Sequence, residues 1–186
     1  MKIKQIFSIP NILSFIRIGL IPFIVWAFFV EEVWLSAGLI LFSALTDIVD
    51  GYIARQYNMV TPLGKALDPI ADKLTLLSII VTLCFISDVV FIVLILFIVK
   101  ETLLGIEGLI IVKKTGTTYS SMWHGKLTTV FLYLTMVIHV VWIDIPELLS
   151  FIFLCVCDVL MIMTLVLYTV RNVKALKEFN KNKFAD

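Results

Sequence analysis

The chain has 186 residues, of which 61% are hydrophobic and 16% are charged, and its formal net charge is +1. Soluble domains have about 45–50% apolar and about 25% charged residues, so this composition excludes an ordinary soluble globular fold. We therefore expect an all-α integral membrane protein, with a single membrane domain over residues 1–186.

Hydropathy predicts six membrane-spanning helices, each close to the roughly 20 residues that a bilayer requires. A short interfacial segment, residues 1–10, is expected before the first helix. The six helices are expected at residues 11–30, 34–56, 66–86, 89–113, 124–143 and 147–171. Residues 172–186 then follow as a basic tail.

The distribution of charge along the chain predicts the orientation of these helices. With six spans, both termini and the second and fourth loops share one side of the membrane. That side carries the basic residues Lys2, Lys4, Arg55, Lys65, Lys113, Lys114, Lys126, Arg171, Lys174, Lys177, Lys181 and Lys183. The opposite loops carry Glu31, Glu32, Asp88, Asp144 and Glu147, and no Lys or Arg. The positive-inside rule therefore predicts cytoplasmic termini in a multi-pass protein of the cell membrane.

Four aspartates form the most distinctive pattern in the chain. Asp47 and Asp50 are three residues apart at the inner end of the second predicted helix, and Asp68 and Asp72 are four apart at the start of the third. Each pair therefore shares a helix face. Since a short loop joins the two helices, we expect the four carboxylates to converge near the cytoplasmic interface.

Four carboxylates in an apolar chain need a counter-charge, because one Asp near the centre of a membrane helix costs about 2.5–3.5 kcal/mol. Hard oxygen ligands suit Mg²⁺ or Mn²⁺, and two ions about 3.5–4 Å apart would hold a transferring phosphoryl group from both sides. An ion-pair network with Arg55, Lys65 and Lys73 is the alternative. The glycines beside the aspartates favour a ligand site, since Gly51 allows close approach of a ligand to the backbone.

Pro69, between Asp68 and Asp72, is compatible with two local structures. It can begin a helix that Asp68 caps, or it can lie inside a helix and kink it. Both structures allow a polar pocket at that depth.

The complete spacing is D-x2-D-G-x2-A-R-x8-G-x3-D-x3-D, from Asp47 to Asp72. With the upstream segment PNILSFIR, it resembles the CDP-alcohol phosphatidyltransferase family, and it looks most like the bacterial phosphatidylglycerophosphate synthases. The resemblance covers residues 10–73 well. It implies a six-helix membrane enzyme, a homodimer, that transfers a phosphatidyl group from CDP-diacylglycerol to an alcohol and releases CMP.

The resemblance also implies roles for individual residues. Asp47, Asp50 and Asp68 would bind metal, and Asp72 would be both a ligand and the base that deprotonates the acceptor hydroxyl. Residues expected to contact CDP-diacylglycerol are Asn11, Ser14, Gly51, Arg55, Thr61 and Gly64. The cofactor is expected to be Mg²⁺ or Mn²⁺, with two ions bound.

The acceptor is less well defined by the pattern. Glycerol 3-phosphate would require cationic side chains, and the candidates are Arg17, Lys65, Lys100 and Lys126. Lys100 lies inside the fourth predicted helix beside Glu101, where an ion pair between these neighbours is the alternative. Glu107 on the same helix would repel a phosphate unless it is paired. His124, near the cytoplasmic interface, is a further candidate for acceptor contact.

Two other functions remain open at this point. One is a cardiolipin synthase of the same family, which uses phosphatidylglycerol as acceptor. The other, from a different class, is a divalent-cation transporter. A transporter would need polar residues to continue across the membrane, whereas the charged residues of the motif gather on the predicted cytoplasmic side.

Overall fold

The structure is a computed structural model that describes residues 9–56, 62–116 and 122–183. Inside these ranges the side chains of residues 9, 10, 48, 50–55, 62, 63, 65, 66 and 180–183 lie outside the description. The described residues form six helices and no strand, so the all-α prediction is confirmed. The interfacial segment predicted at residues 1–10 falls almost entirely outside the described residues.

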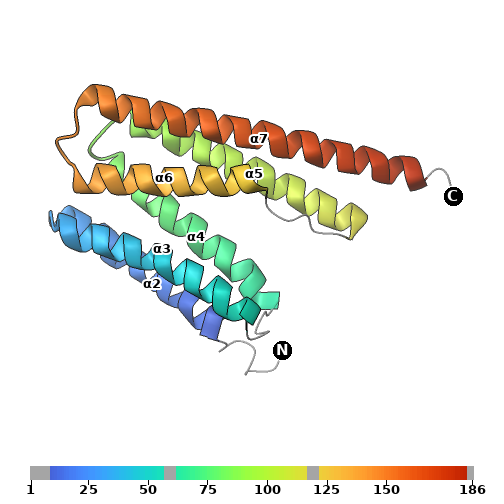
Figure 1. Cartoon of the computed structure of the whole chain (residues 1–186), viewed down its shortest axis with the longest axis horizontal. Helices are drawn as coiled ribbons and strands as arrows, with labels where there is room; N and C mark the ends of the chain where they lie inside the picture. Colours follow the sequence, from blue (N-terminus) through green and yellow to red (C-terminus); the bar gives the residue numbers. More distant parts are fainter. Residues whose placement is uncertain (1–8, 57–61, 117–121, 184–186) are drawn as a thin grey trace. The chain divides into compact units, whose positions relative to one another are not determined.

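The six helices follow the six predicted apolar segments in chain order (Figure 1). They are α2 (Ile9–Phe29), α3 (Val33–Gln56), α4 (Pro62–Leu83), α5 (Val90–Thr115), α6 (Trp123–Val141) and α7 (Glu147–Lys183). Helix α5 ends where Gly116 adopts a left-handed conformation with φ 66° and donates its N–H to the carbonyl of Val112 at 2.9 Å. Glycine has no Cβ to oppose that conformation, and such caps are common at helix ends.

Helix α7 differs most from the prediction, because it continues to Lys183 instead of ending at residue 171. No Gly or Pro follows Pro146, so nothing in the sequence breaks its hydrogen-bond ladder. Its 37 residues extend about 55 Å at 1.5 Å per residue, longer than the roughly 30 Å of a hydrocarbon core. The basic segment is therefore largely helical.

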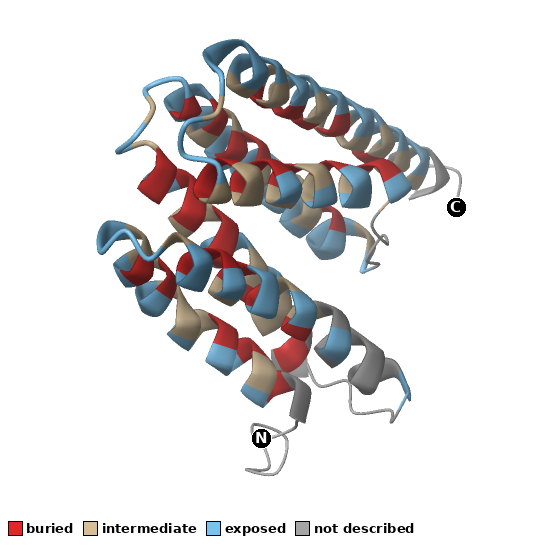
Figure 2. Cartoon of the chain, turned by 60° about the vertical axis from the view of Figure 1, so that its left-hand side comes forward, coloured by how far each residue is buried: buried red, intermediate tan, exposed pale blue. Residues whose placement is uncertain are grey.

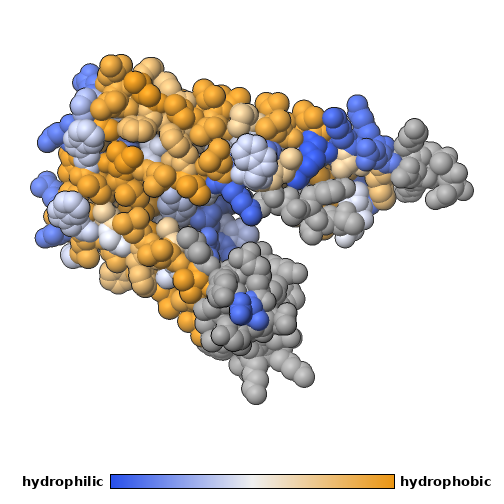
Figure 3. Space-filling view, viewed as in Figure 1, coloured by the Kyte–Doolittle hydropathy of each residue, from blue (hydrophilic) through white to orange (hydrophobic). Residues whose placement is uncertain are grey.

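Three of the described helices are long and apolar enough to cross a membrane. These spans are Asn11–Phe29, Trp123–Val141 and Glu147–Phe179, and α3 contributes a shorter apolar segment at Val33–Asp47. Large hydrophobic side chains are exposed along them, and Figure 3 shows hydrophobic residues over most of the visible helical surface. Exposed apolar surface of this extent is typical of helices that face lipid.

The contacts within the chain divide it into two compact units. The first unit contains α2, α3, α4 and residues 136–145. In it α2 packs against both α3 and α4. Ala27 and Ala71 are fully buried, and such small side chains let membrane helices approach closely. Figure 2 shows that each of these helices has both buried and exposed sides.

The second unit contains α5, residues 123–135 of α6, and α7. Helix α5 packs along α7, and the apolar side chains of Val93, Phe97, Leu154 and Met161 are buried. Thr128 on α6 joins α7, because its hydroxyl lies 2.7 Å from that of Thr164. Hydroxyl pairs of this kind hold membrane helices together without requiring a hydrophobic driving force.

Gly125 is a sensitive position in the second unit. A Cβ added there would lie 2.7 Å from the hydroxyl oxygen of Tyr168 on α7. Gly125→Ala is therefore expected to lower the thermal unfolding midpoint in detergent, since forced overpacking costs about 1–3 kcal/mol. Circular dichroism during heating measures the shift.

Gly105→Ala is the matched control, because a Cβ at Gly105 on α5 meets nothing within 4 Å. That change should leave stability unchanged or raise it, since alanine favours a helix over glycine by about 1 kcal/mol. Equal loss in both variants would contradict the packing argument.

Candidate active site

A buried polar face on α2 is the first component of the candidate site. Asn11, Ser14 and Arg17 are three residues apart along the helix, and none of the three has any solvent exposure. Residues at this spacing lie on one side of a helix. Because α2 packs against α3 and α4, this face is turned toward the helices that carry the aspartates.

Each of the two aspartate pairs receives a hydrogen bond from this face. The Arg17 guanidinium forms an ion pair with the Oδ1 atom of Asp47 on α3. The Ser14 hydroxyl donates to the Oδ1 atom of Asp68 on α4. Through these contacts α2 is joined to Asp47, 30 residues after Arg17, and to Asp68, 54 residues after Ser14. The structure brings Ser14, Arg17, Asp47 and Asp68 together, as members of one polar cluster.

Asp72 lies one turn beyond Asp68 on α4, and both side chains are half-buried. Pro69 lies inside α4, which begins at Pro62. The alternative in which Asp68 caps the start of a helix at Pro69 is therefore wrong. Proline is well tolerated at a first helical position, so Pro62 sets the start of α4 and places the aspartates one to three turns inside it.

Several predicted site residues fall outside what the structure describes. Asp50, Gly51 and Arg55 belong to α3 and Lys65 to α4, but their side chains are outside the described set, and so is all of Thr61. Gly64 is described and buried on the first turn of α4. Among the described side chains alone, no three Asp, Glu, His or Cys residues group closely enough to hold a metal.

The chemistry of the described donors nevertheless fits a hard divalent cation. Asp47 comes from α3, and Asp68 and Asp72 come from α4, which packs against it. The Asp47 side chain is 42% exposed although its partner Arg17 is fully buried, so one side of the carboxylate is accessible. Carboxylates from neighbouring helices commonly form metal sites in bundles. Asp47, Asp68 and Asp72 supply carboxylate oxygens, the ligand type that Mg²⁺ or Mn²⁺ prefers, although these three described side chains do not by themselves form a metal-binding group.

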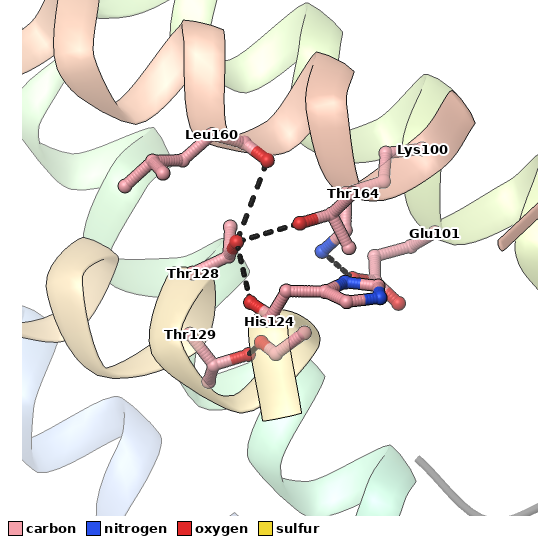
Figure 4. Close-up of polar contacts among 8 residues, drawn as sticks. Lys100, Glu101, His124, Thr128, Thr129, Leu160 and Thr164 are labelled. Carbon is pink, nitrogen blue, oxygen red and sulfur yellow. Dashed lines mark hydrogen bonds and ion pairs between the residues drawn. The ribbon is translucent and has the colours of Figure 1, made fainter. Parts of the chain in front are cut away.

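The second unit contains a separate group of charged side chains. Lys100 is buried, and its Nζ atom lies 2.6 Å from the Oε1 atom of Glu101 (Figure 4). Adjacent residues on a helix do not face each other, but the long lysine side chain can fold back to its neighbour. The predicted ion pair between Lys100 and Glu101 is therefore present, and it leaves an acceptor role for Lys100 untested.

Glu107 is also paired, with α7 as its partner. Its Oε1 atom accepts from the Thr169 hydroxyl at 2.7 Å, and its Oε2 atom accepts from the Asn172 amide at 2.8 Å. Asn172 is buried. Both carboxylate oxygens are satisfied, so Glu107 joins α5 to α7 and its charge is partly compensated.

His124, at the start of α6, lies in a second cluster with residues of α7. Its ring is 5.2 Å from that of Tyr168, and the Arg171 guanidinium lies 4.7 Å from the same tyrosine ring. The Tyr168 hydroxyl accepts the backbone N–H of Met122 at 2.6 Å. Lys126, one turn into α6, is exposed.

Sequence reasoning did not identify Tyr168 as part of a polar group, and it read Arg171 only as a marker of topology. The available signal was the spacing of Tyr168, Arg171 and Asn172 at the inner end of the last apolar segment. Residues three and four apart on a helix are neighbours, so these polar side chains lie close together on α7. Their partners on α5 and α6 could not be read from the sequence.

A family comparison gives an independent result for the whole chain. Residues 7–170 match the model of the CDP-alcohol phosphatidyltransferase family. The match includes all six predicted apolar segments except the last residue of the sixth. It therefore extends well beyond residues 10–73, where the resemblance in sequence is clearest.

Individual relatives agree with the family match. The CDP-diacylglycerol–glycerol-3-phosphate 3-phosphatidyltransferase of Aquifex aeolicus is 33% identical over 174 residues, which cover 90% of this chain and 97% of the relative. The protein of the same name from Rickettsia bellii is 39% identical over 126 residues, 66% of this chain and 68% of the relative. A CMP-forming cardiolipin synthase from Oryza sativa subsp. japonica is 37% identical over 83 residues, 43% of this chain and 25% of the relative. The chain belongs to the CDP-alcohol phosphatidyltransferase family, and it is a transferase.

Proposed function

We propose that this chain transfers a phosphatidyl group from CDP-diacylglycerol to glycerol 3-phosphate, forming phosphatidylglycerophosphate and CMP. The observation that carries the proposal is the near-complete alignment with the Aquifex aeolicus relative, whose name specifies this acceptor. The cardiolipin synthase match covers a quarter of that relative, so it gives weaker support for phosphatidylglycerol as acceptor.

In the proposed reaction, an acceptor hydroxyl oxygen attacks the phosphorus atom that carries the diacylglycerol. A new P–O bond forms, the bond from that phosphorus to the bridging pyrophosphate oxygen breaks, and CMP leaves with that oxygen. Asp72 takes the hydroxyl proton, which requires it to lie within hydrogen-bond reach of the acceptor. Bound Mg²⁺ or Mn²⁺ would neutralise the pyrophosphate and favour departure of CMP.

The remaining roles follow from residue chemistry. Asp47, Asp50, Asp68 and Asp72 are proposed to hold two metal ions, and Arg55 to neutralise part of the CDP charge. Asn11, Ser14, Gly51, Thr61 and Gly64 are proposed to contact CDP-diacylglycerol. Lys100 is a proposed acceptor contact because it is a cation inside an apolar helix, although its ammonium is paired with the Glu101 carboxylate. Lys65 and Lys126 are further candidates.

We propose the topology that the charge distribution indicates: six spans, with both termini and the acidic motif at the cytoplasmic side of the cell membrane. This orientation would give the site access to the water-soluble acceptor and to CMP release. We also propose that the protein is a homodimer from a bacterium, because the family resemblance of the acidic motif implies both. Membership of a transferase family favours an enzyme over a divalent-cation transporter.

An acceptor screen tests the proposed function directly. Purified protein with CDP-diacylglycerol and Mn²⁺ is offered glycerol 3-phosphate, phosphatidylglycerol, serine or inositol phosphate, and CMP release is measured. We expect release with glycerol 3-phosphate and its abolition by a chelator. Release only with phosphatidylglycerol would favour the cardiolipin synthase, and Mn²⁺ flux into proteoliposomes without CMP release would favour a transporter.

A further inference from the structure

Arg17 is the most unusual buried group in the first unit. It is the ninth residue of α2, inside an apolar span, and its side chain has no solvent exposure. Burying a charge away from water is costly unless it is paired and hydrogen-bonded. It forms an ion pair with Asp47, the first aspartate of the acidic motif. Asp47 therefore offsets part of the energetic cost of placing Arg17 here.

The pair is asymmetric in its exposure. Arg17 is sealed between helices, whereas 42% of the Asp47 side chain is accessible. The guanidinium thus contacts one carboxylate oxygen from the protein interior, while part of the Asp47 side chain stays accessible. A ligand that approaches Asp47 from the accessible side meets a carboxylate whose orientation is already fixed.

Ser14 repeats this arrangement on the other aspartate pair. It is fully buried on the same face of α2, one turn before Arg17, and donates to Asp68. One helix therefore supplies a buried donor to the first aspartate of each pair. Ligating carboxylates are commonly oriented by such outer partners, and removal of a partner typically weakens metal affinity or activity by about 10–100-fold.

We infer that Arg17 is a positioning residue for Asp47: its buried guanidinium orients this metal ligand and does not bind the acceptor. The inference rests on the proposed function, because it requires Asp47 to bind metal. An acceptor contact would need Arg17 to reach a soluble phosphate, whereas its side chain is enclosed and engaged with a carboxylate. Arginine suits this position because its planar group can hold a carboxylate with directional hydrogen bonds.

The test compares wild-type protein with Arg17→Gln and Arg17→Lys in detergent micelles. Binding of Mn²⁺ alone is measured from the electron paramagnetic resonance signal of the free ion. We expect Arg17→Gln to weaken Mn²⁺ binding by about 10–100-fold. The Mn²⁺ concentration for half-maximal CMP release should rise in parallel. At saturating Mn²⁺, KM for glycerol 3-phosphate should stay within about twofold of the wild-type value, because Arg17 does not contact the acceptor.

Arg17→Lys keeps the charge but loses the planar donor group, so an intermediate Mn²⁺ affinity is expected. If Arg17→Gln does not fold, the Mn²⁺ affinity of Arg17→Lys tests the inference in its place. Glu107→Gln is the control, since it changes a hydrogen-bonded group between α5 and α7 in the second unit, and its Mn²⁺ affinity should equal that of wild type.

Three results would overturn the inference. Unchanged Mn²⁺ affinity in the Arg17 variants would show that the pair serves stability alone. Tighter Mn²⁺ binding would show that Arg17 repels the ion, and a rise in KM for glycerol 3-phosphate alone would restore the acceptor role. Failure of wild-type protein to bind Mn²⁺ or release CMP would instead contradict the proposed function itself.

Discussion

Asp72→Asn is expected to reduce phosphatidyl transfer by about 10²–10⁴-fold, the usual contribution of a positioned general base. The amide has nearly the shape of the carboxylate but cannot accept the proton of the acceptor hydroxyl. Asp72 lies one turn after Asp68 on α4 and is half-buried, so the substitution alters charge without creating a cavity. The fold and much of the CDP-diacylglycerol binding should remain.

Two measurements separate the loss of the base from general damage. CMP release at saturating acceptor gives kcat, and protection from thermal unfolding by CDP-diacylglycerol reports binding. Asp158→Asn is the control: this aspartate lies inside the last apolar segment, on α7, and its buried Oδ1 atom has no hydrogen-bond partner among the described residues. It should retain transfer within about twofold, as a position outside the acidic motif. Full activity in Asp72→Asn would refute the base assignment.

The helical framework could largely be predicted from the sequence, because apolar length is a direct consequence of the bilayer. The predicted ends of the helices were less accurate than their number and order. The apolar segment ends at the first charged residues, near position 171, so hydropathy predicts the end of the helix there. The backbone hydrogen bonds of α7 need no apolar side chains, and the helix continues to Lys183. Likewise, α4 begins at Pro62, four residues before the predicted apolar segment, because a proline suits a first helical turn.

The acidic motif could be found from spacing, but the partners of its residues could not. Spacing indicates which residues share a face of one helix, and it carries no information about which neighbouring helix packs there. The ion-pair alternative considered Arg55, Lys65 and Lys73 because they are near in sequence. The observed partner of Asp47 is Arg17, 30 residues earlier on α2. That contact depends on tertiary packing alone.

Lys100→Gln is expected to raise KM for glycerol 3-phosphate by about 10–100-fold, because a hydrogen bond to a charged group contributes roughly 1.5–3 kcal/mol. KM for CDP-diacylglycerol should not change. The complication is Glu101, whose carboxylate lies 2.6 Å from the lysine ammonium and would lose that contact. The Glu101 side chain is 20% exposed, so breaking the pair should cost less than the about 3–5 kcal/mol of a fully buried pair, but the single variant still confounds folding with acceptor binding.

The double variant Lys100→Gln with Glu101→Gln separates these effects, because it removes both charges and leaves a neutral pair that can hydrogen-bond. If Lys100 serves only the ion pair, the double variant should regain both wild-type stability and wild-type KM. If Lys100 binds the acceptor phosphate, the double variant should regain stability but keep the raised KM, and Glu101→Gln alone should leave KM unchanged. Lys100→Arg should preserve KM, since arginine also binds phosphate. We expect the second pattern, since Lys100 is a buried cation inside an apolar helix, where ionisable residues usually serve function.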